Sequence, residues 1–233
     1  MEQTYNILPL GDAALVINYR NVIEDGLHHK VLAVAKAIKE ALIEGVGDIV
    51  PAYSSVTVHY DVIVLTKTNK TIPAFHALKK QLEIVIREAK EQVETVSRHF
   101  DIPVCYSPKY ALDVADVAAM TQLKTDEIIT LHTSKTYKVY MIGFLPGFAY
   151  MGEVDERIAV PRKHVPRLTI EEGYVGIAAK QTGIYPLTSP GGWQLIGRTP
   201  IKLFDKHKAE PVLFAAGDEV KFFSITEDEF DNY

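Results

Sequence analysis

Residues 143–200 constrain the fold most, because they cannot form one long helix. The stretch holds nine of the chain's 14 glycines, six of its 12 prolines and its only tryptophan, Trp193. Glycine permits positive φ angles and close backbone approach, whereas proline fixes φ and lacks an amide donor. We therefore expect short strands joined by shaped loops, and such loops on a rigid scaffold are where binding groups usually lie.

Aromatic and basic residues are interleaved with these glycines and prolines. They are Phe144, Phe148, Tyr150, Arg162, Arg167, Lys180, Tyr185 and Arg198. A mixture of this kind predicts a pocket with an apolar wall and a few cationic anchors.

Strand and helix signals alternate in the first part of the chain. Two short β-type runs come first, within residues 5–19, and apolar residues then recur at helical spacing from Leu27 to Leu42. Asn21 and Glu24 have the spacing of a capping box, which would place the start of this helix at Asn21.

Further strands are expected at residues 54–60 and 62–65, and a second helix is expected to begin near Pro73. Two strand–helix units with antiparallel pairing give a ferredoxin-like α+β layer. We expect this small α+β domain to span residues 1–96.

The second part begins with helical signals at residues 113–120 and at Thr125, whose helix would end near His132. Short strands are expected at residues 137–144, 201–204, 212–215 and 220–225. Short, closely spaced strands with little helix predict a β-barrel or sandwich-like domain over residues 97–233.

Composition excludes several classes of function. The net charge of −5 gives no general attraction to nucleic-acid backbones, and no apolar run approaches the roughly 20 residues of a membrane span. The N-terminus lacks the pattern of a secretory signal, and the single cysteine, Cys105, fits a reducing compartment. We therefore expect a cytoplasmic protein that binds neither nucleic acid nor membrane.

The familiar catalytic motifs are absent from the sequence. No GxxxxGK[ST] phosphate loop, GxGxxG fingerprint or GxSxG elbow occurs, and there is no Met-Lys-Met biotin signal. The eight histidines have no metal-ligand spacing, so no metal site is predicted. Function must therefore be argued from the shaped loops.

The loop at residues 143–148 has two open interpretations. Its backbone amides could face an anion or a developing oxyanion, or its two phenylalanines could simply fill the core. Arg162 and Arg167 lie between prolines and suit carboxylate or phosphate recognition, although a solvated basic loop is the alternative.

Three further residues carry similar alternatives. Lys180 follows an apolar strand and could neutralise a phosphate or act as a base, or it could be an ordinary exposed lysine. Trp193 reads as a core residue first and a binding wall second. His132 could line the cleft or could interact with the dipole at a helix end.

Several runs together resemble one known family. The matching residues are Asp113 to Ala118, His132, Tyr137, GFLPGFAYMG, PRKHVPR, Gly173, QTGIYPLTSPGGWQLIGRTP and the closing Ala216-Gly217-Asp218. On these residues the chain resembles the PxpB/KipI family, also called the allophanate hydrolase subunit 1 family. The resemblance covers nearly the whole chain and departs at Ala216, where the family usually has proline.

This resemblance implies a cyclophilin-like β-barrel behind the smaller α+β domain. It also implies work with a PxpC-like homologous subunit and a PxpA-like subunit as an ATP-dependent 5-oxoprolinase, with Mg²⁺ accompanying the nucleotide. That reaction opens 5-oxo-L-proline to L-glutamate. Two alternatives follow from the same resemblance: an inhibitor that binds a sporulation-type histidine kinase, and a carboxyltransferase subunit related to urea or allophanate metabolism.

The 5-oxoprolinase hypothesis assigns roles to particular residues, with a small acidic substrate in mind. Arg162, Arg167 or Arg198 would anchor its carboxylate. The cradle would be formed by Phe144, Pro146, Gly147 and Phe148, with Tyr185 beside it. Lys180, Gln181 or His132 would handle the proton or orient the lactam.

Overall fold

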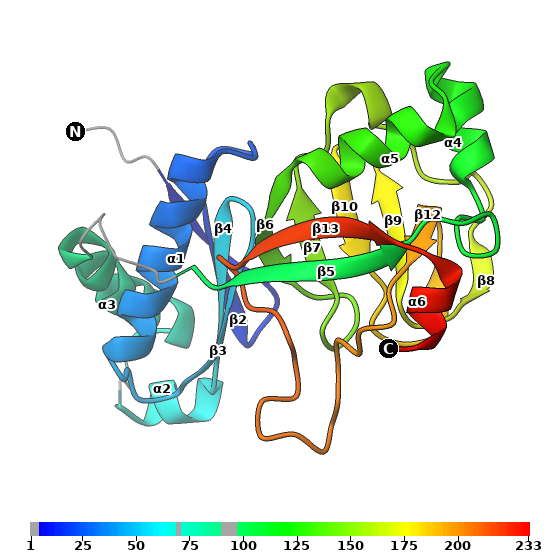
Figure 1. Ribbon diagram of the computed structural model, residues 1–233. Coiled ribbons are helices and arrows are strands. Elements are labelled where there is room, and N and C mark those ends of the chain that lie inside the picture. The colour runs from blue at the N-terminus through cyan, green and yellow to red at the C-terminus, as the bar shows by residue number, and fades with distance from the viewer. Residues whose placement is uncertain (1–4, 69–70, 90–96) are drawn as a thin grey trace. The chain divides into compact units, whose positions relative to one another are not determined.

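The chain divides into two units, Met1–Thr95 and Val96–Tyr233. The computed structural model describes residues 5–68, 71–89 and 97–233 (Figure 1). The boundary predicted between residues 96 and 97 lies at the edge of a segment outside the described residues. Each unit has its own apolar core.

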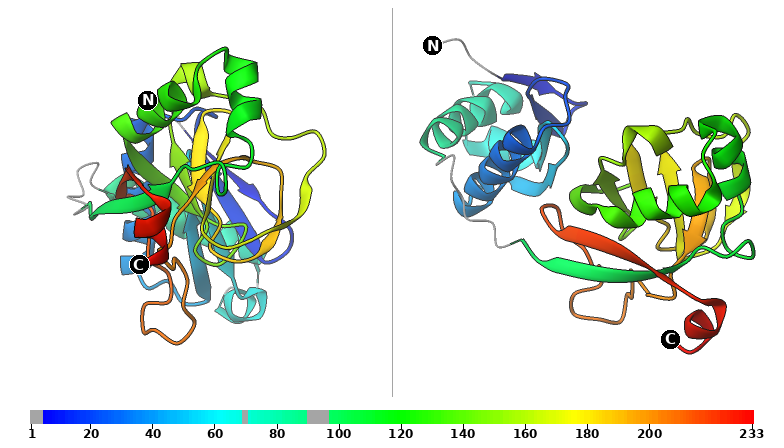
Figure 2. Two further views of the ribbon diagram at one scale, coloured as in Figure 1. Left: turned by 45° about the vertical axis from the view of Figure 1, so that its right-hand side comes forward. Right: turned by 45° about the horizontal axis from the view of Figure 1, so that its top comes forward.

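The described part of the first unit is an antiparallel sheet with helices packed on it. Its elements are β1 (Asn6–Pro9), β2 (Ala14–Asn18), α1 (Asp25–Glu40), β3 (Val46–Pro51), β4 (Ser55–Tyr60), α2 (Val62–Thr68) and α3 (Ala74–Glu88). The strand order is β1-β2-β4-β3. Leu15 and Ile17 of β2 are buried two residues apart, as expected for one face of a strand. Helices α1 and α3 pack against each other over this core (Figures 1 and 2).

The ferredoxin-like topology predicted for this unit is not confirmed. A ferredoxin-like fold runs β-α-β-β-α-β, with its last strand after the second long helix. Here the sheet position beside β2 is filled by β1, from the start of the chain, and the described residues show no strand between α3 and β5. The coarser prediction, a mixed α+β layer, is correct.

Two local predictions in this unit are wrong for identifiable reasons. The run at 62–65 is not a strand but the start of α2, because the Asp61 carboxylate accepts hydrogen bonds from the amides of Ile63 (2.8 Å) and Val64 (3.0 Å). Helix α1 begins at Asp25 with Glu24 at the N-cap position, so Asn21 does not cap it. Strand β3 was not predicted.

The second unit is built around a closed barrel. Its strands are β5 (His99–Cys105), β6 (Thr136–Ile142), β7 (Ala149–Gly152), β8 (Arg167–Ile170), β9 (Tyr174–Ala178), β10 (Gln181–Ile184), β11 (Ser189–Gly191), β12 (Gln194–Arg198) and β13 (Glu219–Ile225). The barrel order is β10-β7-β6-β13-β5-β12-β9, and β8 pairs separately with β11. Strands β5 and β13 run parallel, whereas the other barrel pairs are antiparallel. The predicted β-barrel domain is therefore present.

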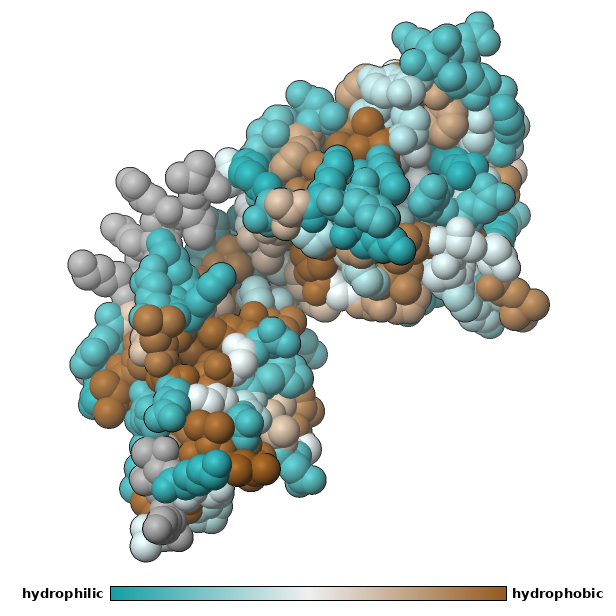
Figure 3. All heavy atoms as spheres, turned by 90° about the horizontal axis from the view of Figure 1, so that it is seen from below, coloured by the Kyte–Doolittle hydropathy of each residue, from teal (hydrophilic) through white to brown (hydrophobic). Residues whose placement is uncertain are grey.

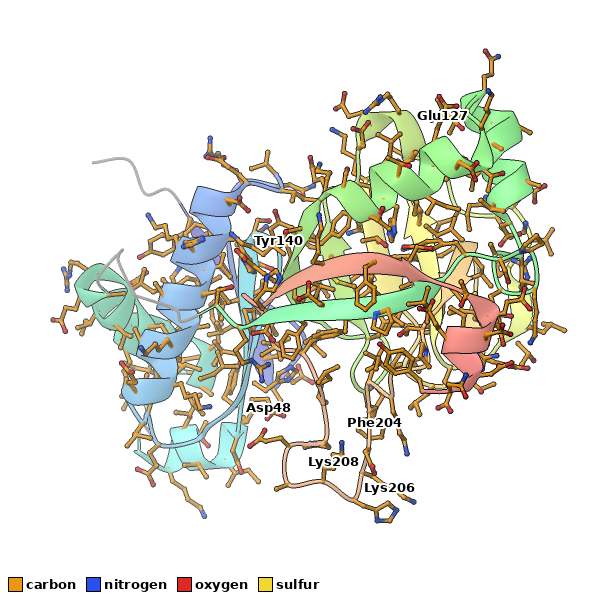
Figure 4. All side chains as sticks on the ribbon, in the orientation of Figure 1. Asp48, Glu127, Tyr140, Phe204, Lys206 and Lys208 are labelled. Atoms are coloured by element: carbon orange, nitrogen blue, oxygen red, sulfur yellow. The ribbon has the colours of Figure 1, made fainter. Side chains whose placement is uncertain are left out.

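Short helices complete this unit. They are α4 (Val114–Thr121), α5 (Thr125–Ser134), the 3-10 turn η1 (Glu156–Ile158) and α6 (Glu227–Asp231). Helices α4 and α5 lie against one side of the barrel (Figure 2), and α5 contributes the buried Ile128 to its core. Glu127 caps α5, since its carboxylate accepts the amide of Lys124 at 2.8 Å (Figure 4).

The segments at 201–204 and 212–215, predicted as strands, meet only in an isolated bridge between Phe204 and Val212. Between them the chain makes an exposed loop that carries Lys206 and Lys208 away from the barrel (Figure 4). The two segments pair too briefly to form a ladder.

Candidate functional site

A pocket of about 320 Å³ lies in the second unit, over an apolar cluster separate from the barrel core. We call it the aromatic pocket. Its lining residues are Phe144, Leu145, Phe148, Tyr150, Arg162, Pro166, Tyr185, Ser189, Pro190, Gly191, Gly192 and Trp193. This volume is in the range of small-molecule sites, and an apolar lining with one cation is typical of them.

Edge-to-face ring packing makes the wall of the pocket rigid. The ring of Phe148 meets those of Tyr150, Tyr185 and Trp193 at centroid distances of 4.8, 5.4 and 5.4 Å, each in a T-shaped arrangement. Each such pair contributes about 0.5–1.5 kcal/mol beyond the area it buries. The wall is therefore preorganised rather than formed on binding.

Two glycines let these rings approach the backbone. A Cβ at Gly191 would overlap the Tyr185 hydroxyl, and one at Gly183 would lie 2.9 Å from the Ala149 carbonyl oxygen and 3.1 Å from the Phe148 and Trp193 rings. The contacts with the Tyr185 hydroxyl and the Ala149 carbonyl are too close for an added carbon atom, so the packed wall requires glycine at these positions.

The loop between β6 and β7 forms one side of the pocket. Phe144 has a φ of 68° and Gly147 a φ of 84°, so the chain turns sharply at both. The amides of Gly143, Leu145 and Phe148 donate to carbonyls within the same loop. These three amides are used within the loop, and the side chains of Phe144 and Phe148 line the pocket. The anion cradle at this loop stays a prediction. Pro146 and Gly147 are outside the lining.

Arg162 is the cation of the aromatic pocket. Its guanidinium carbon lies 5.8 Å from the Trp193 ring centroid, within cation–π range. Burial raises the pKa of Tyr185 and of Tyr150, and the nearby Arg162 charge opposes both shifts. Among the carboxylates of the described residues, none forms an ion pair with Arg162. Its charge is therefore available to an anionic ligand.

Arg167 has a structural partner instead. Its Nη1 and Nη2 each donate to the buried Asp113 carboxylate at 2.7 Å, and Lys163 Nζ donates to the same group at 2.7 Å. The amide of Leu195 donates to it as well, at 2.8 Å. Although burial raises the pKa of Asp113, the hydrogen bonds from Arg167, Lys163 and Leu195 lower it by more. Asp113 thus fixes the 162–167 loop against β12.

Arg198 lies at a second hollow rather than in the aromatic pocket. This polar hollow of about 370 Å³ is lined by Glu172, Gly173, Tyr185, Pro186, Arg198, Thr199, Pro200, Ile201, Lys202, Leu203 and Phe230. Arg198 Nη1 lies 2.8 Å from Glu171, its Nε donates to the Glu172 carbonyl, and its guanidinium covers the Tyr174 ring. Tyr185 lines both hollows.

The residues expected to handle a proton are elsewhere. Lys180 Nζ donates to Glu156 at 2.8 Å on the surface, and this bond raises the pKa of the lysine, which opposes a role as a base. Gln181 begins β10 and is half-buried. Neither residue lines the aromatic pocket or the polar hollow.

His132 is a buried core residue. Its Nδ1 lies 2.8 Å from the Tyr106 hydroxyl, its Nε2 lies 2.9 Å from Thr182 Oγ1, and its ring stacks on Phe222. Because the Thr182 hydroxyl donates to the Gly176 carbonyl, it accepts from His132, so Nε2 carries the proton and Nδ1 accepts from Tyr106. Burial lowers the pKa of His132 to about 3. It is neutral and does not reach the aromatic pocket.

The structure thus brings together Phe144, Phe148, Arg162 and Tyr185 of the predicted site. Tyr150, from the same aromatic and basic set, lines the pocket with them, and Trp193 takes the wall position that was its second interpretation. The role of Asp113 was not predicted, because nothing in the sequence near residue 113 indicates a partner 50 or more residues away. Within the described ranges, no group of three or more His, Cys, Asp or Glu residues is arranged to hold a metal ion. The described helices include none with the length and apolarity needed to cross a membrane.

Comparison with known proteins supports one family over almost the whole chain. Residues 5–214 match the model of the carboxyltransferase domain, subdomain C and D. The B-type subunit of 5-oxoprolinase from Bacillus subtilis is 41% identical over 238 residues, covering 100% of this chain and 98% of that protein. The protein of the same name from Haemophilus influenzae is 37% identical, with 93% and 96% covered.

Solved structures share the fold. The crystal structure of TTHA0988 superposes with a TM-score of 0.77 at 31% identity, over 91% of this chain but 40% of that chain. The uncharacterized protein PH0987 from Pyrococcus horikoshii gives 0.56 at 39% identity, over 97% and 100%. A Kluyveromyces lactis urea amidolyase gives 0.79 at 19% identity, which shows a common fold alone. The chain therefore belongs to the family of the carboxyltransferase domain, subdomain C and D, together with the B-type subunits of 5-oxoprolinase.

Proposed function

We propose that this chain is the B-type subunit of an ATP-dependent 5-oxoprolinase complex, which opens 5-oxo-L-proline to L-glutamate. The observation that carries the proposal is its similarity, from end to end, to proteins that bear the name of this 5-oxoprolinase subunit. PxpC-like and PxpA-like subunits are the proposed partners.

The aromatic pocket suits the substrate of this reaction. The substrate, 5-oxoproline, is a small, nearly flat ring with one carboxylate, so it needs an apolar wall and one cation. Phe148, Tyr150 and Trp193 supply the wall, and Arg162 supplies a guanidinium without a carboxylate partner among the described residues. We assign Arg162 as the carboxylate anchor and remove Arg167 and Arg198 from that role, because acidic side chains already occupy them.

The aromatic pocket does not fit ATP by itself. A triphosphate carries several negative charges, whereas the lining offers one guanidinium and the amides of the 143–148 loop are largely used within that loop. We infer that a companion subunit supplies most of the contacts to ATP and to the Mg²⁺ that accompanies it. The lactam is a resonance-stabilised amide, so its oxygen must be polarised or phosphorylated before water attacks. The role of this chain is to hold the ring and its carboxylate during that step.

The test is a coupled assay of the assembled complex. Co-expressed wild-type subunits are expected to form glutamate from 5-oxo-L-proline and ATP. Arg162→Ala is expected to lower kcat/KM for 5-oxoproline about 100-fold, mainly through KM, since one charge-assisted hydrogen bond contributes about 1.5–3 kcal/mol. Arg157→Ala is the matched control, because Arg157 is an exposed arginine that pairs with Asp155 away from the pocket. Equal kinetics for both variants would remove Arg162 from the site.

A second candidate is carboxyl transfer in a urea-type pathway. It is favoured by the family description and by a putative urea carboxylase of Emericella nidulans, which is 22% identical over 95% of this chain. The chain would then need a separate biotin carrier, and carboxyl transfer to urea by such a mixture would support this candidate. Inhibition of a histidine kinase stays a prediction. Affinity capture from cell extract distinguishes it from the enzyme-subunit function, because the inhibitor would recover a kinase and the enzyme subunit would recover a PxpC-like chain.

A further inference from the structure

Three of the side chains that line the aromatic pocket end in a hydroxyl group. They are Tyr150, Tyr185 and Ser189. A hydroxyl that faces a pocket without a protein partner can be satisfied by a ligand, whereas one that is enclosed or already bonded belongs to the wall. The surroundings of the three hydroxyls therefore indicate which of them a ligand would contact.

Two of these hydroxyls belong to the wall. Tyr185 is 1% exposed, and its hydroxyl lies so close to the backbone at Gly191 that a Cβ there would overlap it. Ser189 is 7% exposed, and its hydroxyl donates to the Pro190 carbonyl at 3.1 Å. Both hydroxyls thus lie against the backbone of β11.

Tyr150 differs from them, because its side chain is half-buried and its hydroxyl has no hydrogen-bond partner among the described residues. Its neighbours in β7, Ala149 and Met151, are buried in the barrel core. Since side chains alternate along a strand, Tyr150 points to the opposite face, where it lines the pocket. Phe148 and Trp193 hold its ring at centroid distances of 4.8 and 5.9 Å. The phenol is therefore positioned before a ligand binds.

The Tyr150 phenol and the Arg162 guanidinium serve the same part of the pocket. Both lie beside Trp193, whose ring centroid is 5.9 Å from that of Tyr150 and 5.8 Å from the Arg162 guanidinium carbon. Burial raises the pKa of Tyr150, and the Arg162 charge opposes this shift, as expected for two groups close enough to interact. The phenol is protonated at neutral pH, so it can donate a hydrogen bond.

An apolar wall alone would not select one small ring over another. Apolar side chains are exposed on both units (Figure 3), and contact with such side chains discriminates weakly between ligands of similar shape. A positioned donor discriminates strongly, because an analogue without the matching acceptor leaves that donor unpaired. The ring of 5-oxoproline carries two acceptor groups, the carboxylate and the lactam oxygen, on the two carbons that flank its nitrogen. One guanidinium and one phenol match these two groups.

We propose that Tyr150 determines specificity, its hydroxyl donating a hydrogen bond to the lactam oxygen of 5-oxoproline while Arg162 binds the carboxylate. This inference rests on the proposed function and on its assignment of Arg162. The hydrogen bond recognises the lactam and also draws electron density toward its oxygen, which is the polarisation that ring opening needs. Cyclic carboxylates that lack the carbonyl are the compounds that this contact rejects.

The experiment compares two ligands in the complex assembled from this chain and its companion subunits. Equilibrium dialysis without ATP measures the Kd of labelled 5-oxo-L-proline and of labelled cyclopentanecarboxylate, which has the ring and the carboxylate but no lactam. Tyr150→Phe removes the hydroxyl and keeps the ring, so thermal unfolding is expected to match wild type. This variant is expected to bind 5-oxo-L-proline about tenfold more weakly and cyclopentanecarboxylate at least as tightly as wild type.

Tyr174→Phe is the matched control for this change. Tyr174 is a buried tyrosine of the second unit that lines neither the aromatic pocket nor the polar hollow. Losing its hydroxyl is expected to leave the Kd of both compounds as in wild type.

The outcomes separate this inference from the proposed function, which glutamate formation from 5-oxo-L-proline and ATP tests in the same complex. If Tyr150→Phe binds 5-oxo-L-proline like wild type, or loses affinity for both compounds equally, the inference is overturned, and an active wild-type complex leaves the proposed function standing. A selective loss of 5-oxo-L-proline binding in a complex that makes no glutamate supports the hydrogen bond and overturns the proposed function. A wild-type complex that does not bind 5-oxo-L-proline overturns both.

Discussion

His132 stabilises the barrel as a neutral imidazole. Tyr106, Thr182 and Phe222 surround its ring, so that one ring nitrogen accepts from a hydroxyl and the other donates to one. Protonation would place an uncompensated charge in the core. The ring therefore packs in the barrel core and does not line the aromatic pocket.

This predicts a specific loss of stability in acid. The unfolded chain protonates His132 below its ordinary pKa of 6.5, whereas the folded chain does so only near 3. Between these values the unfolded state binds more protons, so the free energy of unfolding falls as pH falls. From pH 7 to pH 5 the loss from this residue is about 2 kcal/mol. In denaturant titrations, the free energy of unfolding of His132→Gln is expected to fall by about 2 kcal/mol less than that of wild type between pH 7 and pH 5.

The exposed His164 provides the comparison for this measurement. His164→Gln is expected to keep the pH dependence of the wild-type chain. If His132→Gln and wild type lose equal free energy of unfolding between pH 7 and pH 5, the conclusion that His132 is buried as a neutral imidazole is wrong.

Among the elements, the loop at 162–167 depends on a contact that no local pattern predicts. Arg167 looked like a substrate anchor, because an arginine between prolines suits carboxylate recognition. The structure satisfies that chemistry internally, since the carboxylate it binds is Asp113 at the start of α4. Arg162, five residues earlier in the same loop, is left for the ligand.

Asp113→Asn is therefore expected to lower the free energy of unfolding by about 3 kcal/mol, because it leaves Arg167 and Lys163 without their buried carboxylate. The same variant should raise KM for 5-oxoproline in the complex, because the loop that carries Arg162 loses its anchor. Denaturant unfolding and steady-state kinetics check the two parts.

Asp116→Asn is the control for this change. Its carboxylate is exposed and contacts Lys163 at 3.2 Å, so a loss within about 0.5 kcal/mol is expected. Equal losses of unfolding free energy in Asp113→Asn and Asp116→Asn would contradict the role of Asp113 as the buried anchor of the 162–167 loop.

Element prediction failed where a side chain acted on a neighbouring backbone. The β-branched run after Asp61 has strand-like composition, yet the Asp61 carboxylate caps it as the helix α2. Helix α3 begins after Pro73 as predicted, because proline at a helix start depends only on the local sequence. Periodicity identified helix α1 but not its cap.

For the whole molecule, the sequence predicted a mixed α+β chain with a barrel in its second part, since glycines, prolines and short apolar runs are local signals. The strand order of the first unit was not predictable, because β1 pairs beside β2 at a position that the ferredoxin-like topology gives to a later strand. The candidate site was half predicted. Within the 143–200 block, Phe148 and Arg162 line one pocket. Arg198, at the end of β12, lines the polar hollow instead, and Lys180, in the turn between β9 and β10, pairs with Glu156 on the surface.

We propose that the aromatic pocket of this chain holds 5-oxoproline within an assembled 5-oxoprolinase. Trp193 is the only tryptophan, so 5-fluorotryptophan incorporated into this chain alone gives one ¹⁹F resonance at the pocket wall. In the complex with unlabelled companion subunits, titration with 5-oxo-L-proline is predicted to shift that resonance saturably, and Arg162→Ala is predicted to weaken the titration about 100-fold. A complex that converts 5-oxoproline while this resonance stays unchanged would contradict the account.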